Sequence, residues 1–181
     1  MLPEELEKKF IEEYSFNQSK YSVIESKLNI DRYQIRKLYE KCKPEIGRIQ
    51  KIRNKFTGQR RTDFDNDFKE FYTWYQKQVE EVAKCYYCDI TQDELNILFR
   101  EEKILPLNDA IKRSSGSLEI ERRDSTSNSY RPENIVLACP LCNNAKSNLI
   151  DEESWKVLFK QPMKEYYKKL LDKAKSKSVL Y

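Results

Sequence analysis

Four of the five cysteines form two closely spaced pairs. The pairs are Cys85-Tyr-Tyr-Cys88 and Cys139-Pro-Leu-Cys142. A CxxC spacing brings two thiolates about one turn apart, and two such pairs complete a tetrahedral site for Zn²⁺. Four thiolates leave no coordination position open, so we expect the zinc to be structural and not catalytic. Cys42 lies apart, and we expect it to be a small buried hydrophobic residue.

The sequence contains no histidine among its 181 residues. Catalytic triads with histidine, Cys-His dyads and metal sites that use imidazole are therefore excluded. Any general acid–base step must use a carboxylate, a lysine, a tyrosine or a metal-bound water. The three glycines form neither a P-loop nor a dinucleotide-binding fingerprint, which argues against those two classes of nucleotide site.

Two carboxylates, Glu119 and Glu121, lie two residues apart in a stretch with a strand-like pattern. Alternate residues of a strand share a face, so both carboxylates can converge on one cation. Carboxylate and amide oxygens suit Mg²⁺, which also engages substrate phosphate. An alternative interpretation is that these carboxylates only pair across a hairpin with nearby arginines, which are Arg122, Arg123 and Arg131.

Two strands and a series of helices must position these groups. Residues 118–123 and 135–139 are the strand candidates, and the polar stretch 124–132 between them suits a long hairpin loop. The helices expected after this hairpin cover roughly 140–148, 151–160 and 162–176. The predicted fold class is α+β and mostly helical.

The segment 118–146 resembles the HNH, or ββα-metal, endonucleases that carry two zinc knuckles. An acidic strand, a loop, an asparagine at the second strand and a knuckle that continues as CNNAK follow one another in the family's order. With the first knuckle included, the resemblance covers about residues 85–148. It implies a zinc-bound ββα core and a metal-dependent nuclease activity.

The resemblance also implies roles for single residues. Glu121 takes the place of the family's metal-binding aspartate, and Arg122 takes the place of its catalytic histidine. Asn134 corresponds to the asparagine that pins the loop between the strands. Asn143 takes the other metal-binding position, so a catalytic Mg²⁺ or Mn²⁺ would be held by Glu121 and Asn143. Lys146 matches the common helix lysine.

Arg122 cannot serve as the general base, because a guanidinium stays protonated at cellular pH. We expect it to bind phosphate and to stabilise the negative charge that develops there. The remaining candidates for the base are Glu119, Tyr130, Lys146 and hydroxide generated on the metal. Some phage-type members of the HNH family carry a tyrosine at the position that corresponds to Tyr130 in this chain.

The N-terminal part shows a succession of short helical patterns. Residues 4–14 and 20–28 are amphipathic, and Asp31 is a good N-cap for a helix that runs through Cys42 and ends at Pro44. The expected order is a helix, a tight turn and a second helix whose first turns are basic. This is the order of a helix-turn-helix motif, although small helical bundles show the same order. The residues left free to contact DNA are Tyr33, Gln34, Arg36 and Lys37.

Charge is segregated between two neighbouring stretches. Residues 41–61 carry eight basic residues against Glu45 alone, and residues 62–102 carry eleven acidic against four basic residues. This pattern indicates an anionic partner such as nucleic acid, or else two solvated faces that offset each other. The candidate DNA contacts are Arg48, Lys51, Arg53, Lys55, Arg60 and Arg61, with Arg123 and Arg131 farther along the chain.

The elements of this charged region complete the expected organisation. A helix is expected over 45–56, and Gly58 opens a break that suits a linker or a phosphate-contacting arm. One long helix over 63–84 would then pack an aromatic stripe into the core. We expect a helix-turn-helix-like DNA-binding module with its basic linker over 1–61, and an HNH-like nuclease domain over 62–181.

These expectations combine into one predicted function, a divalent-metal-dependent DNA endonuclease of restriction or homing type. Its partner is double-stranded DNA, and a homodimer would allow both strands of a palindrome to be cut. The alternatives are a non-catalytic zinc-containing DNA-binding or regulatory protein, and a structure-selective nuclease such as a junction resolvase. The sequence shows neither a signal peptide nor an apolar stretch near the roughly 20 residues of a membrane span, so we expect a cytoplasmic protein.

Overall fold

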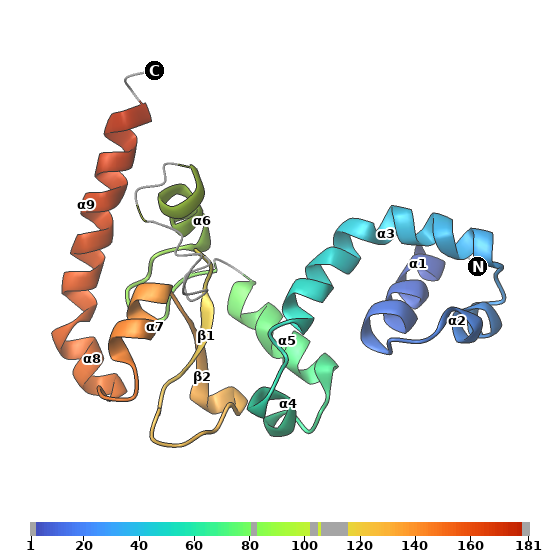
Figure 1. Ribbon diagram of the computed structural model, residues 1–181, viewed down its shortest axis with the longest axis horizontal. Helices are drawn as coiled ribbons and strands as arrows, with labels where there is room; N and C mark the ends of the chain where they lie inside the picture. Colours follow the sequence, from blue (N-terminus) through green and yellow to red (C-terminus); the bar gives the residue numbers. More distant parts are fainter. Residues whose placement is uncertain (1–2, 81–82, 102–104, 106–115, 179–181) are drawn as a thin grey trace. The chain divides into compact units, whose positions relative to one another are not determined.

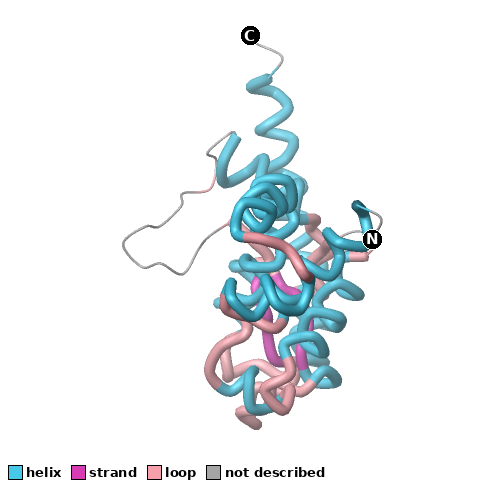
Figure 2. Tube along the Cα trace, turned by 90° about the vertical axis from the view of Figure 1, so that its right-hand side faces the viewer, coloured by secondary structure: helices cyan, strands magenta, loops and turns pink. Residues whose placement is uncertain are grey.

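The computed structural model describes residues 3–80, 83–101, 105 and 116–178. Within this part the chain is mostly helical, with a single pair of strands (Figure 2), so the predicted α+β class is confirmed. The chain divides into two compact units, Met1–Tyr75 and Gln76–Tyr181. This division lies beyond residue 61, where the sequence suggested the limit of the N-terminal module. No helix among the described residues is long and apolar enough to cross a membrane.

The first unit consists of helices (Figure 1), and three of them contribute the buried residues of one apolar cluster. The helices are α1 (Pro3–Ile11), the π-helical turn η1 (Glu12–Phe16), α2 (Tyr21–Leu28), α3 (Arg32–Arg53) and α4 (Gln59–Asp63), with α5 (Phe68–Val79) crossing the division. The buried members of the cluster are Phe10, Ile24, Leu28, Ile35, Cys42 and Ile46. Cys42 is therefore a buried core residue, as the sequence predicted.

A tight turn joins α2 to α3, as expected. Asn29 ends α2 with a left-handed φ of 51°, which asparagine tolerates better than most residues. Asp31 caps α3: its Oδ1 accepts a hydrogen bond from the Gln34 amide at 2.8 Å, and Gln34 Oε1 accepts one from the Asp31 amide at 2.9 Å. The side chain of Gln34 is thus engaged in the cap. That the motif binds DNA stays a prediction.

The prediction that Pro44 ends a helix is wrong. Helix α3 runs without a break from Arg32 to Arg53 and contains Pro44. Proline removes one backbone hydrogen bond and costs about 3 kcal/mol inside a helix. The buried side chains of Cys42, Ile46 and Ile49 continue one face across the proline, and their packing outweighs that cost.

The prediction of one long helix over 63–84 is also wrong. The chain forms the short helix α4, turns, and starts again at Phe68. The turn contains Asp65 and Asn66, whose φ angles of 48° and 60° are incompatible with a right-handed helix. The break expected after Gly58 is therefore helical, and Arg60 and Arg61 lie in α4. Of the expected aromatic stripe, Phe64, Phe68 and Phe71 are buried, and Trp74, which was not expected in the stripe, is buried with them.

The second unit is built on one antiparallel hairpin, as predicted. Strand β1 (Glu119–Arg122) pairs with β2 (Ile135–Ala138) in a register that sets Ile120 opposite Leu137. Every residue of β2 is buried, whereas Ile120 is the one buried residue of β1. Because successive strand residues point to opposite faces, Glu119 and Glu121 share the face of β1 away from Ile120.

The helices of the second unit follow the predicted order. They are α6 (Gln92–Asn96), η2 (Ile97–Glu101), the short turn η3 (Pro132–Asn134), α7 (Pro140–Lys146), α8 (Glu152–Leu158) and α9 (Lys160–Ser178). Thr91 caps α6 together with Glu94. Helix α7 packs on β1, while α8 and η2 both contact the long helix α9 (Figure 1).

Candidate functional site

The four paired cysteines converge on one point of the second unit. The sulfur atoms of Cys85, Cys88, Cys139 and Cys142 all lie within 4.8 Å of one another, and all four residues are buried. The Sγ atoms of Cys88 and Cys139 are 3.8 Å apart. Four sulfurs placed about 2.3 Å from a central Zn²⁺ would be separated by about 3.8 Å in a tetrahedron. The cluster therefore fits the predicted donor set and could hold a metal ion such as zinc.

Local backbone structure shapes both knuckles. In the first, the Cys85 amide donates to the Ile90 carbonyl at 2.8 Å, and Asp89 turns the chain with a φ of 61°. In the second, Cys139 is the N-cap of α7, and its Sγ accepts a hydrogen bond from the Cys142 amide at 3.3 Å. The second pair is therefore fixed by the start of a helix, and the first by a tight turn.

A tyrosine of α9 contacts the cysteine cluster. The hydroxyl of Tyr167 donates a hydrogen bond to Cys139 Sγ at 3.2 Å, and the side chain is only 2% exposed. Tyr167 was not among the site residues predicted from the sequence. Tyr167 and Ala174 are spaced so that they share one face of the expected helix, and this spacing could have marked Tyr167 as buried. No local pattern in the sequence indicated that it contacts Cys139.

The two carboxylates of β1 face helix α7. Glu119 Oε2 accepts a hydrogen bond from Asn143 Nδ2 at 2.5 Å, and Glu121 Oε1 lies 3.3 Å from Lys146 Nζ. The structure thus brings together four of the residues to which the sequence gave metal-binding or catalytic roles. Asn143 contacts Glu119 in the structure, whereas the resemblance implied that Asn143 and Glu121 would hold one metal ion together.

Lys146 is fully buried, which is unusual for a lysine. Besides Glu121, it donates to the Arg122 carbonyl at 3.1 Å and to Ser125 Oγ at 2.8 Å. Burial raises the pKa of the Glu121 carboxyl, and the positive charge of Lys146 opposes that rise. Burial is the larger effect, so the pKa of Glu121 stays above its ordinary value even with Lys146 beside it.

The arginines of the hairpin do not pair with these carboxylates. Arg122 Nη1 donates to the Ser127 carbonyl and to Asn128 Oδ1, both at 3.0 Å, and its guanidinium lies 5.2 Å from the ring centre of Tyr130. Arg123 binds Glu152 instead, with its Nε 2.6 Å from Oε2. Among the described residues, neither Glu119 nor Glu121 forms an ion pair with Arg122, Arg123 or Arg131, so the structure does not support the alternative interpretation of these carboxylates as simple partners of the arginines.

Asn134 ties the ends of the loop together. Its Oδ1 accepts a hydrogen bond from the Asp124 amide at 2.8 Å, while its Nδ2 donates to the carbonyls of Ser129 at 2.8 Å and Asp124 at 3.1 Å. These bonds are those expected of an asparagine that pins the loop between the strands. Asn134 therefore shapes the loop that carries Tyr130.

A polar network beside the first knuckle was not foreseen. Glu152 accepts hydrogen bonds from Arg123 and from the Tyr86 hydroxyl at 2.8 Å, and it pairs with Lys156. Burial alone would raise the pKa of Glu152, but the hydrogen bonds from Arg123, Lys156 and Tyr86 lower it to about 2. These residues are far apart in the sequence, so no local pattern could identify the network.

The candidate DNA contacts of the first unit differ in how they are engaged. Tyr33 is 65% exposed, and Lys37 Nζ lies 4.6 Å from its ring centre. Arg48 pairs with Glu45, and Arg60 Nη1 donates to the Lys55 carbonyl at 3.0 Å. Three further candidates of this unit are exposed, namely Arg36, Lys51 and Arg61. Arg131 of the second unit is exposed as well.

The chain has limited similarity to known proteins. No protein-family model matches it, and no curated protein matches it. One solved structure with similarity is that of the rare-cutting HNH restriction endonuclease PacI, at 27% sequence identity and a TM-score of 0.43. The similarity covers 55% of this chain and 62% of that chain, which is less than two thirds of that protein's structure.

Proposed function

We propose that this chain is a divalent-metal-dependent DNA endonuclease of the HNH type. The observation that carries the proposal is the convergence of Glu119 and Glu121 of β1 with Asn143 and Lys146 of α7. These residues occur in the order that the sequence shares with HNH nucleases. Their hairpin and helix are held beside four buried cysteines that could hold zinc. The same resemblance supports site-specific cleavage of the restriction or homing kind.

Oxygen donors of β1 and α7 would hold the catalytic metal. Glu121 and Asn143 are the proposed ligands, and Glu119 lies within hydrogen-bond distance of Asn143. Carboxylate and amide oxygens suit Mg²⁺ or Mn²⁺. Such an ion, when bound, activates water and neutralises phosphate charge.

Arg122 and Lys146 have different tasks in this proposal. Arg122 is anchored to the loop by Ser127 and Asn128, and its guanidinium would bind a phosphate oxygen of the scissile group. Lys146 is buried and donates to three acceptors, so it cannot reach a substrate. It is a positioning residue that holds Glu121 and the start of the loop.

The proton acceptor is assigned to Tyr130. Of the side chains considered, Lys146 is buried and Glu119 is bonded to Asn143. Tyr130 is half-buried and lies beside the guanidinium of Arg122, where the phosphate would bind. A hydroxyl so placed can accept a proton from the attacking water when it is ionised.

The first unit would supply DNA affinity. Helix α3 begins after a tight turn and a capping box, and its first turns present Tyr33, Arg36 and Lys37. This order supports a helix-turn-helix role in which α3 contacts base edges in the major groove. A homodimer would then place two such helices on a palindromic site.

Nicking of supercoiled plasmid by zinc-loaded protein tests this function. We expect nicking with Mg²⁺ or Mn²⁺, its loss in Glu121→Gln, and retention of DNA binding by that variant. Glu133→Gln, at an exposed residue of η3, is the matched control and should nick normally. A protein that binds DNA but never cuts it would contradict the proposal and favour the non-catalytic alternative. Cleavage of branched substrates alone would favour a structure-selective nuclease.

A further inference from the structure

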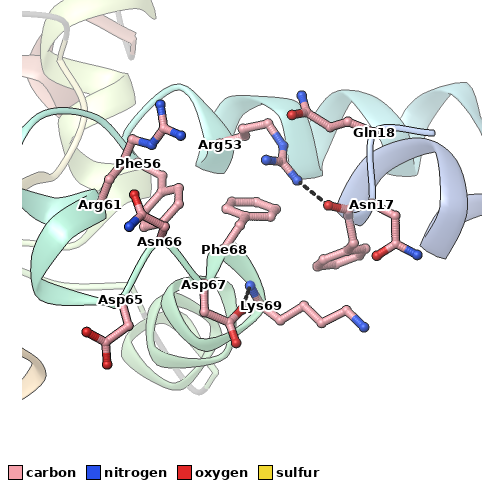
Figure 3. Close-up of a pocket in the computed structure, with 11 residues that line it drawn as sticks. Asn17, Gln18, Arg53, Phe56, Arg61, Asp65, Asn66, Asp67, Phe68 and Lys69 are labelled. Carbon is pink, nitrogen blue, oxygen red and sulfur yellow. Dashed lines mark hydrogen bonds between the residues drawn. The ribbon is translucent and has the colours of Figure 1, made fainter. Parts of the chain in front are cut away.

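A polar pocket of about 720 Å³ lies in the first unit. It is formed by the loop that follows η1, the end of α3 and the turn that precedes α5 (Figure 3). Its volume falls within the range of small-molecule and ligand sites. Two arginines, Arg53 and Arg61, contribute to its lining, together with Asn17 and Asn66.

Arg53 is held rigidly in this pocket. Its Nη2 donates to the carbonyls of Ser15 at 2.5 Å and Phe16 at 3.0 Å. Its guanidinium lies 3.7 Å from the ring centre of Phe68. In Figure 3 the other amino group of Arg53 points to the side on which Arg61 and Asn66 lie. An arginine fixed by two carbonyls and a ring has little conformational freedom to lose when it binds an anion.

The two arginines lack acidic partners. Arg32, Arg48 and Arg123 each pair with a glutamate. Within the described part of the chain, however, neither Arg53 nor Arg61 lies within 4.0 Å of a carboxylate oxygen. Burial lowers the pKa of Arg53, and the positive charge of Arg61 lowers it further. An anion between the two guanidinium groups would relieve this repulsion.

The pocket also contains two carboxylates and one lysine. Asp67 Oδ1 accepts hydrogen bonds from the amides of Lys69 at 2.7 Å and Glu70 at 3.2 Å, which caps α5. The ammonium of Lys69 pairs with Glu12. Asp65 and Asp67 both line the pocket, and the negative charges of both oppose an anion.

We propose that Arg53 and Arg61 form a phosphate-binding site in this pocket and that its occupant is a backbone phosphate of DNA. Guanidinium groups match phosphate oxygens with paired hydrogen bonds, whereas chloride offers no such geometry. The amide groups of Asn17 and Asn66 can add further donors. This proposal deepens the proposed function and rests on DNA as the partner.

Two measurements on the full zinc-loaded chain test the site. The first follows the side-chain NMR signals of Arg53, Arg61 and Asn66 during titration with inorganic phosphate, with chloride at equal ionic strength for comparison. The second measures duplex binding over a range of salt concentrations in Ca²⁺. The first should show a saturable shift with phosphate only. A phosphate shift no larger than that caused by chloride would overturn the site.

The variants separate this site from general charge effects. Arg61 is exposed, so Arg61→Gln should fold normally, abolish the phosphate shift and reduce the slope of log K against log salt by about 1. Asp65→Asn should strengthen phosphate binding, because it removes one of the two opposing charges at a turn that asparagine tolerates. Lys8→Gln, which removes an exposed lysine paired with Glu4, is the control and should leave the slope unchanged.

The outcomes also separate the site from the nuclease proposal. If the wild-type chain binds DNA and Arg61→Gln has the wild-type slope, the site is overturned while the proposed function stands. If phosphate shifts the arginine signals but the chain does not bind DNA, the assignment of the occupant is overturned together with the proposed function. Arg53→Lys keeps the charge but loses the planar fork, and it should weaken phosphate binding.

Discussion

Lys146 Nζ lies 3.3 Å from Glu121 Oε1, and no part of the Lys146 side chain is exposed to solvent. The pair joins the end of α7 to β1, and the same ammonium group also bonds the Arg122 carbonyl and Ser125 Oγ. One lysine therefore fixes both the proposed metal-binding carboxylate and the start of the loop. Lys146→Met would leave the Glu121 carboxylate without a cation, whereas Glu121→Gln keeps a side-chain oxygen that can accept the hydrogen bond from Lys146.

The buried pair predicts a large stability effect for Lys146→Met. The change leaves Glu121 without its cation, and breaking a buried pair in this way costs roughly 3–5 kcal/mol. The free energy of unfolding of the zinc-loaded protein in urea measures this loss. The double variant Glu121→Gln with Lys146→Met should recover part of the stability, because no unpaired charge remains. Equal stability of Lys146→Met and wild type would contradict the account of this pair.

The hydrogen bond from Tyr167 to Cys139 Sγ predicts weaker zinc retention in Tyr167→Phe. Groups that hydrogen-bond metal ligands typically change metal affinity by about 10–100-fold. Competition with a chromophoric chelator measures the affinity, and Co²⁺-substituted protein should show a shifted thiolate-to-metal band. Tyr166→Phe is the matched control, because Tyr166 is the exposed neighbour on α9. Identical bands and affinities in both variants would remove Tyr167 from the metal site.

The network around Glu152 predicts a pH-dependent contribution to stability. The pKa of Glu152 is lowered to about 2 from an ordinary value of 4.5, so the folded state binds its proton more weakly than the unfolded state. The stabilisation is therefore complete above about pH 4.5 and is lost as the pH falls towards 2. The difference in unfolding free energy between wild type and Glu152→Gln should shrink over that range. A difference that stays constant from pH 7 to pH 3 would contradict this assignment.

The position of Tyr130 beside Arg122 predicts a catalytic defect in Tyr130→Phe. Loss of a general base typically slows the chemical step by about 10²–10⁴-fold. Single-turnover cleavage should slow to this extent, while the affinity for DNA stays unchanged. Tyr166→Phe again serves as the control. An unchanged cleavage rate would move the proton acceptor to Glu119 or to metal-bound hydroxide.

Much of the candidate site was predictable because its signals are local. The cysteine spacing, the hairpin around 124–132 and the cap at Asp31 each depend on residues close together in the sequence, and the structure confirms them. Asn134 was predicted to pin the loop, and its hydrogen bonds do so.

What the sequence did not predict depends on packing between distant residues. Pro44 is a local helix breaker, but the apolar face of α3 continues across it. The contacts of Glu152 with Tyr86 and of Tyr167 with Cys139 span many residues and leave no periodic pattern. Likewise, only the packing of α7 on β1 directs Glu121 towards Lys146 and away from the arginines of its own hairpin.

Cleavage of a complex library of duplex DNA, followed by sequencing of the new ends, tests the central claim most directly. Zinc-loaded wild-type protein with Mg²⁺ or Mn²⁺ is predicted to generate ends that share one sequence motif, and Glu121→Gln is predicted to generate none above background while still binding DNA. Wild-type protein that binds the library but yields no more ends than Glu121→Gln would contradict the assignment of this chain as a nuclease.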